Sequence, residues 1–344
     1  MISRRKFIKK MAVFFSFIPL GVMGFFEWFS RSVSKTDPGA AEPAKPSASE
    51  PAPPKKVSPE PLLSMFLLSD LHISVSESSM TEKLHWALKD VTDFESKVEA
   101  IVLGGDLTDF GRASDYKLLK SVLDKYTLPP VHANLGNHDY YDVWLNKDGQ
   151  FSTDTVPNGK TDAQSRQRFM EFFGYGKPYN DVWINGVHLI MVSQEAYYQE
   201  KPEVGEGAWY SDEQLAWLQE TMKAHADGKP ALIFIHQPLP ALGMDGRTHQ
   251  LIRATEFRNI LKPYKNVFVL SGHTHRNFVG ESHYNKDNTF HWFNNASVGR
   301  TRSSSGSVAQ GMYIQVYEDR VVVRGREFSN RSWIDEANWT VSLV

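Results

Sequence analysis

The chain contains no cysteine. This absence excludes a disulfide scaffold, a thiolate zinc site and an iron–sulfur cluster, so any bound metal must be held by the oxygen and nitrogen atoms of Asp, Asn and His. Long apolar runs are also scarce, with one such run near the N-terminus, between Met11 and Phe29. A protein with many membrane spans is therefore excluded. The sequence also lacks internal repeats, which excludes a repeat array.

Positive charge is in the minority in the main part of the chain. Residues 61–344 hold 28 Lys and Arg against 35 Asp and Glu, a formal charge of −7. A mildly acidic body argues against binding to a nucleic-acid polymer, which requires a basic surface. The length of this region suits one large domain with a full core, and we expect that domain to cover residues 61–344.

The N-terminus carries an export signature. Ser3-Arg4-Arg5-Lys6-Phe7-Ile8-Lys9 is a twin-arginine motif followed by the apolar run, and it predicts a signal peptide or signal anchor over residues 1–35. The expected partner is the twin-arginine translocation machinery, which carries folded proteins across the cytoplasmic membrane. This route suits a protein that acquires its metals before export, and it predicts a periplasmic or extracellular location.

The fate of the signal is open on sequence grounds. Gly39-Ala40-Ala41 is the best candidate cleavage site, but the apolar run of about 19 residues is also long enough to stay in the bilayer as a tether. Residues 36–60 are rich in Pro, Ala and Ser and have almost nothing to bury, which predicts a disordered linker.

From residue 62 onward, strand-like apolar runs alternate with amphipathic helical patterns. The expected elements are a strand ending at 69, helix 80–98, strand 100–104, helix 113–126, strand 131–135, helix 163–173, a hairpin over 182–191, a helix after Ser211, strand 231–235, helix 250–262, strand 267–271 and mostly strands beyond it. This order predicts an α/β protein, specifically a four-layer α/β/β/α sandwich of two mixed sheets.

Five short polar blocks follow five of the apolar runs. The blocks contain Asp70 and His72; Asp106 and Asp109; Asn137, His138 and Asp139; His236; and His273 and His275. Because ligand sites collect at the carboxyl ends of the strands in an α/β sheet, we expect these side chains to converge. Such a set of oxygen and nitrogen ligands predicts two metal ions, and without thiolates it suits Mn, Fe or Zn.

Taken together, the five blocks resemble the calcineurin-like metallophosphoesterases over a stretch from about Leu67 to His275. The class III cyclic-nucleotide phosphodiesterases and the purple-acid-phosphatase-like branch are the most similar, partly through residues 207–218. The resemblance implies the calcineurin-like phosphoesterase fold and a dinuclear metal centre. It assigns Asp70, His72, Asp106 and His275 to one metal, and Asp106, Asn137, His236 and His273 to the other.

The resemblance also implies a reaction. A hydroxide that bridges the two metals attacks phosphorus, His138 protonates the leaving alkoxide, and Asp109 orients His138 and favours its charged form. Asp139 is interpreted as structural. Purple acid phosphatases carry a tyrosine ligand in the second block, whereas this block has Asp109 and no tyrosine, so a purple iron–tyrosinate chromophore is not expected.

The sequence thus predicts an exported, metal-dependent phosphoesterase that acts on a phosphomonoester or phosphodiester. Two alternatives stay open: a pyrophosphatase of lipid-linked or nucleotide substrates at the membrane, and a non-catalytic metal-binding protein of the cell envelope. Substrate discrimination is expected in loops 140–162, 238–250 and 276–310, where His249 with Arg247, and Arg300 with Arg302, are candidate contacts.

Overall fold

The computed structural model describes residues 60–287, 289–303 and 307–344. The predicted signal over 1–35, its apolar run and nearly all of the predicted linker over 36–60 lie outside these residues. The described residues belong to one compact unit. None of the helices in this part of the chain has the length and apolar character needed to cross a membrane.

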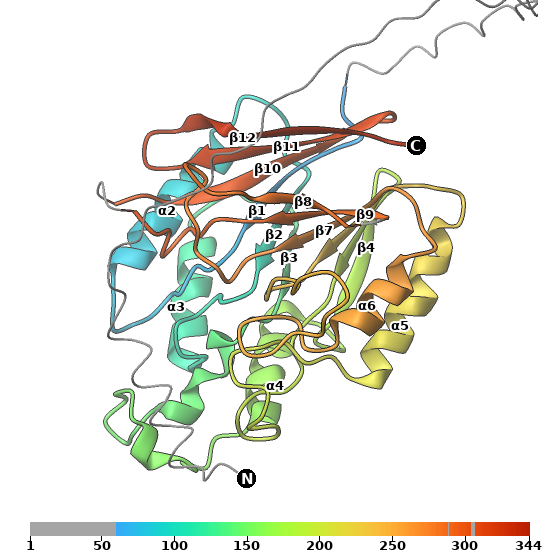
Figure 1. Ribbon diagram of the computed structural model, residues 1–344. Coiled ribbons are helices and arrows are strands. Elements are labelled where there is room, and N and C mark those ends of the chain that lie inside the picture. The colour runs from blue at the N-terminus through green and yellow to red at the C-terminus, as the bar shows by residue number, and fades with distance from the viewer. Residues whose placement is uncertain (1–59, 288, 304–306) are drawn as a thin grey trace, which may run out of the picture. The chain divides into compact units, whose positions relative to one another are not determined.

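Two six-stranded sheets form the centre of the described region (Figure 1). The first has the order β12-β11-β10-β1-β2-β3 and contains β1 (Leu63–Leu68), β2 (Ala100–Gly104), β3 (Val131–Asn134), β10 (Gln310–Val316), β11 (Arg320–Glu327) and β12 (Ser332–Ser342). The second has the order β4-β5-β6-β7-β9-β8 and contains β4 (Asn180–Ile184), β5 (Val187–Met191), β6 (Ala231–Phe234), β7 (Val267–Ser271), β8 (Tyr284–Lys286) and β9 (Phe290–Asn294). Parallel pairing joins β1 to β2 to β3, and β5 to β6 to β7 to β9, while the other pairs are antiparallel. The predicted fold class is therefore confirmed.

Helices flank the two sheets. They are α2 (Ser79–Thr92), α3 (Ala113–Leu123), α4 (Asp162–Phe173), α5 (Asp212–Met222) and α6 (Ala254–Leu261), with 3-10 turns η1 (His138–Trp144), η2 (Thr153–Thr155) and η3 (Lys223–His225). Figure 1 shows α2 and α3 on the side of the first sheet and α5 with α6 on the side of the second. Each sheet thus has one face against the other sheet and one face against helices, as the four-layer prediction requires.

Helices α2, α3 and α6 are shorter than the sequence pattern suggests, and a tertiary contact accounts for α2 and α6. Helix α2 ends at Thr92 because Phe94 leaves the helical path to place its ring 5.1 Å from that of Phe66, edge to face. Helix α6 starts only at Ala254 because Leu251 forms a strand-like bridge with Ala208. In both cases a tertiary contact outweighs local helix propensity.

Strand residues alternate between two cores. Met65, Leu67 and Phe234 lie in the core between the two sheets, whereas Ile233 and Val269 lie in the core between the second sheet and helices α5 and α6. Strands that are buried on both faces read as continuous apolar runs, which explains the uninterrupted hydrophobic segments before the polar blocks. Burial of the strands fixes where each strand ends, and so where each polar block begins.

The first sheet gives a direct test of this packing. Phe66 is fully buried and contacts the rings of Phe94, Tyr313 and Phe328. We expect Phe66→Ala to lower the free energy of unfolding by about 3–5 kcal/mol, because it removes a buried ring and leaves a cavity. Guanidinium denaturation in the presence of a chelator measures this change. The matched control is Val75→Ala at a half-exposed position, with an expected change within about 0.5 kcal/mol; an equal change in both variants would contradict the packing argument.

Candidate metal centre

The loops after β1 and β2 are joined by backbone hydrogen bonds. The amide of Asp70 donates to the carbonyl of Gly105 and the amide of His72 to that of Asp106, each over 3.0 Å. In return, the amide of Asp109 donates to the carbonyl of Ile73 over 3.0 Å. The side chains of the first two polar blocks are thereby held in a fixed register.

Asp139 attaches the third block to the second. Its fully buried carboxylate accepts hydrogen bonds from the amide of Gly136 at 3.1 Å and from the amide and hydroxyl of Thr108 at 3.0 Å each. Burial, together with the nearby charge of Asp106, raises the pKa of Asp139 to about 6. These contacts give Asp139 the structural role that its sequence position suggests.

The blocks of the second sheet are tied to those of the first by side chains. His236 Nδ1 donates to the carbonyl of Gly104 over 2.8 Å, and the amide of His273 donates to Asp70 Oδ1 over 3.0 Å. The carbonyl of His236 in turn accepts from the amide of Gly272 at 2.9 Å. All five blocks therefore meet at one place, where strand ends of the two sheets come together.

The backbone of this region is strained. Of the nine residues other than glycine that have positive φ in the described part of the chain, six lie here, namely Asp70, His72, Asp106, His249, His273 and His275, with φ between 49° and 68°. Each such conformation costs about 1–3 kcal/mol and persists only where the surroundings enforce it. Close packing adds a further constraint, since a Cβ at Gly136 would lie 2.2 Å from Asp106 Oδ1.

The convergence produces three groups of candidate metal ligands, of which two share Asp106 and the third is His72, Asp109 and His138. Within each group one donor atom per residue lies within 4.8 Å of the others; the first group is Asp70, His72, Asp106 and His275, and the second is Asp106, His236 and His273. Asp106 belongs to both the first and the second group. The sequence resemblance implies the same sets with Asn137 added to the second, and the assignment of these residues to two metals stays a prediction.

Unpaired nitrogens show where metal ions fit. His273 Nδ1 is buried without a hydrogen-bond partner, and the buried His236 Nε2 has only the Asp106 carboxylate beside it, 3.2 Å from Oδ2. His236 Nδ1 donates to the carbonyl of Gly104, so in the neutral ring the lone pair of Nε2 is available to a cation. His273 Nε2 lies 3.2 Å from His249 Nδ1, so Nδ1 is the His273 nitrogen that is left for a cation. The carboxylate and imidazole donors fit two divalent metal ions.

The charges of the centre shift its pKa values strongly. Burial alone would lower the pKa of His236, but the carboxylates of Asp106 and Asp70 outweigh it and raise that pKa to about 9. His72 shows the opposite balance, since burial and the neighbouring His138 lower its pKa to about 3. Burial also lowers the pKa of His273. Without metal, protonated His236 therefore carries part of the charge balance of the two buried carboxylates.

His138 and Asp109 form a pair beside the ligands. His138 Nδ1 lies 3.0 Å from the backbone carbonyl of Asp109 and 3.2 Å from its Oδ1, so this nitrogen carries a proton and Nε2 is the atom left for a reactant. Burial opposes a charge on His138, but Asp106 and Asp109 outweigh burial and raise its pKa. The Arg300 guanidinium lies 2.9 Å from the same Asp109 oxygen, at the rim of the site.

The family follows from a direct comparison. A model described as calcineurin-like phosphoesterase matches residues 64–277. The chain belongs to this family. A phosphoesterase of this kind hydrolyses phosphoric ester bonds, and the two ligand groups sharing Asp106 supply the binding places for two divalent ions.

Individual relatives of this calcineurin-like phosphoesterase are distant. The chain is 24% identical to the probable glycerophosphodiester phosphodiesterase GpdQ of Arcobacter nitrofigilis, over 61% of this chain and 70% of that protein. Its fold is similar to a dimetal phosphatase from Danio rerio, with a TM-score of 0.58 and 14% identity, covering 83% of this chain and 100% of that one. A purple acid phosphatase from yellow lupin (Lupinus luteus) seeds gives a TM-score of 0.56 at 11% identity, covering 83% of this chain and 55% of that one.

One side chain beside the candidate ligands of the phosphoesterase centre, Glu206, is not singled out by the sequence. Glu206 is buried and bonds to Asn137 Nδ2 over 2.7 Å, and the ring of Tyr141 stacks on that of His138 with 3.9 Å between centroids. Gly205 and Gly207 on either side of Glu206 are the one local signal, and glycine pairs are too common to identify a site. His249 is found next to His273, as a partner of a candidate ligand.

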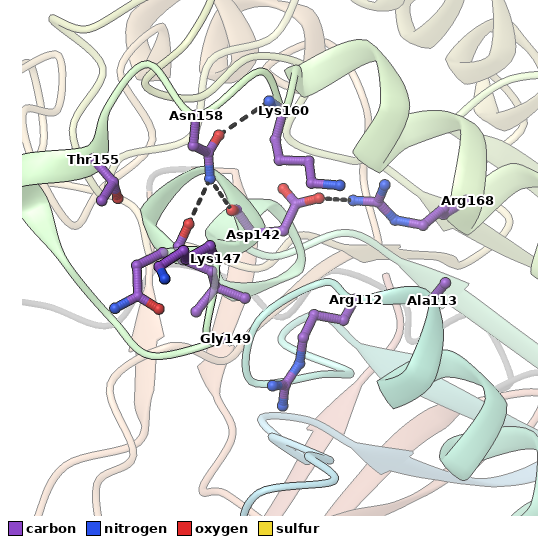
Figure 2. A pocket seen from close by; sticks show the side chains of 11 residues that line it. Arg112, Ala113, Asp142, Lys147, Gly149, Thr155, Asn158, Lys160 and Arg168 are labelled. Atoms are coloured by element: carbon purple, nitrogen blue, oxygen red, sulfur yellow. Dashed lines mark hydrogen bonds and ion pairs between the residues drawn. The ribbon is translucent and has the colours of Figure 1, made fainter.

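A cavity of about 610 Å³ lies at the other end of η1 (Figure 2). Figure 2 shows Asp142 pointing toward Arg168. Asp142 Oδ2 lies 2.5 Å from Arg168 Nη2, and the Asn158 amide donates to the carbonyls of Asp142 and Leu145. The polar groups of this cavity anchor η1, the turn that begins with His138. The residues that line the cavity include none of the candidate metal ligands.

The pKa of His236 predicts a pH dependence of metal binding. A metal ion needs the neutral imidazole, and the raised pKa of about 9 means that the apoprotein holds a proton there at neutral pH. We expect apparent metal affinity to rise with pH up to about 9, by as much as tenfold per unit, and binding at pH 7 to release a proton. Calorimetric Mn²⁺ titrations in buffers of different ionisation enthalpy measure this release. Heats that are independent of the buffer would contradict it.

Proposed function

We propose that the protein is an exported enzyme that hydrolyses phosphodiesters, and phosphomonoesters as secondary substrates. The observation that carries the proposal is the pair of ligand groups that share Asp106, with His138 beside them. This arrangement combines a place for two cations with a proton donor, which are the two requirements of phosphate-ester hydrolysis at neutral pH.

The proposed ligands are the seven side chains that converge. Asp70, His72, Asp106 and His275 hold one ion, and Asp106, Asn137, His236 and His273 hold the other. When bound, the two ions neutralise phosphoryl oxygens and lower the pKa of a water molecule between them. Asp106, which belongs to both ligand groups, would contribute to both ions and so reduce the repulsion between two neighbouring dications.

The remaining chemistry is assigned to the residues of the His138 pair. His138 protonates the leaving oxygen through Nε2, because Asp109 holds Nδ1 through its backbone and carboxylate oxygens. Asp109 thereby fixes the ring orientation and supports the charged form. Arg300, which is one-third exposed and bonded to Asp109, lies where it can meet an anionic substrate without entering the ligand set.

The preference for a diester rests on two considerations. The glycerophosphodiester activity attached to the name of the Arcobacter relative supports a diester with an alkoxide leaving group. An alkoxide is a poor leaving group and needs a proton donor such as His138. A pyrophosphatase would depend less on a proton donor such as His138. A non-catalytic metal-binding protein would have no use for the His138–Asp109 pair.

The export part of the proposal rests on the sequence alone. The twin-arginine motif at Ser3-Arg4-Arg5 and the apolar run from Met11 to Phe29 support passage to the periplasm or the exterior, with the run either removed or kept as a membrane tether. Both segments lie outside the described residues.

Activity assays test the enzymatic proposal. We expect the Mn-loaded protein to release product from bis-p-nitrophenyl phosphate, from a glycerophosphodiester and, more slowly, from p-nitrophenyl phosphate. His138→Ala should retain both metals but lower kcat on the glycerophosphodiester by about 10²–10⁴-fold, since general acid catalysis contributes that much. The loss on bis-p-nitrophenyl phosphate should be smaller, because p-nitrophenolate leaves without a proton.

The matched control is His85→Ala, a histidine on α2 that bonds to Tyr126 and not to the metal centre. This variant should have wild-type kcat. Absence of any turnover above the chelated sample would contradict the enzymatic proposal and favour the non-catalytic alternative. Preferential turnover of a nucleotide pyrophosphate, with little effect of His138→Ala, would favour the pyrophosphatase.

Export has its own test. Replacing both arginines, Arg4→Lys and Arg5→Lys, keeps the positive charge but removes the twin-arginine pair. In cells with the twin-arginine machinery, we expect this variant to stay in the cytoplasm as an active, metal-loaded protein. Cell fractionation with activity measurement checks this. Unchanged export of the variant would point to the general secretory route instead.

A further inference from the structure

A buried carboxylate lies directly behind Asn137. Glu206 is 6% exposed, and its Oε2 accepts hydrogen bonds from Asn137 Nδ2 at 2.7 Å and from the Tyr141 hydroxyl at 2.6 Å. Its Oε1 accepts from the Tyr197 hydroxyl at 2.8 Å, and Trp144 Nε1 donates to that hydroxyl at 2.9 Å. Both carboxylate oxygens therefore act as acceptors only.

This arrangement decides which way the Asn137 amide faces. An amide side chain has an oxygen at one end and an NH₂ group at the other, and only the oxygen can bind a metal. Because Glu206 accepts, Asn137 must turn its NH₂ group toward Glu206, which leaves Oδ1 on the other side. The remaining contact of Oδ1 is a long one of 3.4 Å from Gln237 Nε2. The amide orientation is thus set by its neighbours and not by Asn137 itself.

The same carboxylate reaches His138 through Tyr141. The hydroxyl of Tyr141 is held by Glu206, and the Tyr141 ring stacks on His138 with 3.9 Å between centroids and 25° between planes. The Tyr141 ring also stacks on that of Tyr197, with 5.6 Å between centroids. Glu206 is therefore bonded to one proposed ligand and to the aromatic wall of the proposed proton donor.

The Glu206 segment is itself anchored to the loop of His249. The Ala208 amide donates to the Gln250 carbonyl over 3.0 Å, and a Cβ at Gly207 would lie 2.6 Å from the Arg247 carbonyl. Glu206 has little room to move relative to this loop, which also carries the partner of His273. One short segment thus supports two of the residues proposed to hold the second metal.

We infer that Glu206 is a positioning residue that orients Asn137 so that its oxygen binds the second metal ion. The inference rests on the proposed function, because it takes Asn137 as a ligand. An outer hydrogen-bond partner of a metal ligand typically contributes 10–100-fold to metal affinity. The contribution here should be specific to the ion held by Asp106, Asn137, His236 and His273.

Metal titration of variants tests this role. Mn²⁺ is added to the apoprotein and free ion is followed by its electron paramagnetic resonance signal. We expect Glu206→Gln to keep one tight Mn²⁺ and to bind the second 10–100-fold more weakly. Asn137→Asp alone should also weaken the second ion, because two carboxylates would face each other at the 2.7 Å contact.

The double variant Asn137→Asp with Glu206→Gln separates positioning from a general structural role. Both terminal atoms of aspartate are oxygens, so it needs no orientation, and glutamine can donate to it. We expect the double variant to bind the second Mn²⁺ more tightly than either single variant. A double variant no better than the weaker single variant, or a Glu206→Gln protein that binds both ions like the wild type, would overturn the inference.

Two further proteins complete the design. Tyr197→Phe removes a donor to Glu206 Oε1 but leaves the contact with Asn137, and should bind both ions like the wild type. Glu206→Asp keeps the charge, but its side chain is one methylene too short to reach Asn137. If Glu206→Gln does not fold, Glu206→Asp should show the same weaker binding of the second Mn²⁺. Wild-type binding by Glu206→Asp would overturn the inference. Metal affinity is measured without turnover. If the double variant restores binding of the second ion but the protein hydrolyses no phosphate ester, the proposed function alone is refuted and the inference about Glu206 stands.

Discussion

Two carboxylates withdrawn from water, Asp70 and Asp106, impose the condition that the rest of the centre satisfies. A buried charge costs several kcal/mol unless it is paired, and here both groups are fully enclosed. The surrounding imidazoles pair with them, and the protonated His236 carries part of the balance without metal. Two dications would satisfy the same carboxylates more completely, since each donor group is arranged around a common centre. Folding and metal binding are therefore coupled, because both depend on neutralising the same two buried carboxylates.

The scaffold solves this problem with short, rigid connections. Backbone bonds between the loops after β1 and β2 set the first two blocks, and the buried Asp139 adds the third. The bond from His236 to Gly104 then crosses from one sheet to the other. Six residues of the centre adopt a left-handed backbone conformation, and the free energy that each conformation costs is part of the cost of bringing the blocks together. A second layer, formed by His249 and Glu206, sets the direction in which imidazole and amide groups present their lone pairs.

Much of the fold follows from the sequence because hydrophobic periodicity reports burial. Uninterrupted apolar runs such as Ala100–Gly104 and Val267–Ser271 become strands covered on both faces, and the polar blocks begin where they end. Helix boundaries follow less well. Helix α2 stops before Phe94 because that ring is buried against Phe66, a residue from a different strand. No local pattern within 80–98 carries this information, since the energy that decides it comes from a contact across the chain.

The sequence by itself determined the kinds of donor atoms, their order along the chain and the absence of thiolates, because these depend only on residue type. It also placed Asp70, Asp106 and His236 at strand ends, through the apolar runs before them. Only the tertiary structure decided which atom of each side chain is available to a metal. Nε2 of His236 and Nδ1 of His273 are available because the other nitrogen of each ring contacts a neighbouring group. The role of Glu206 is of the same kind. Hydrogen-bond direction depends on partners brought close by folding, and those partners lie 69 positions apart in the case of Asn137 and Glu206.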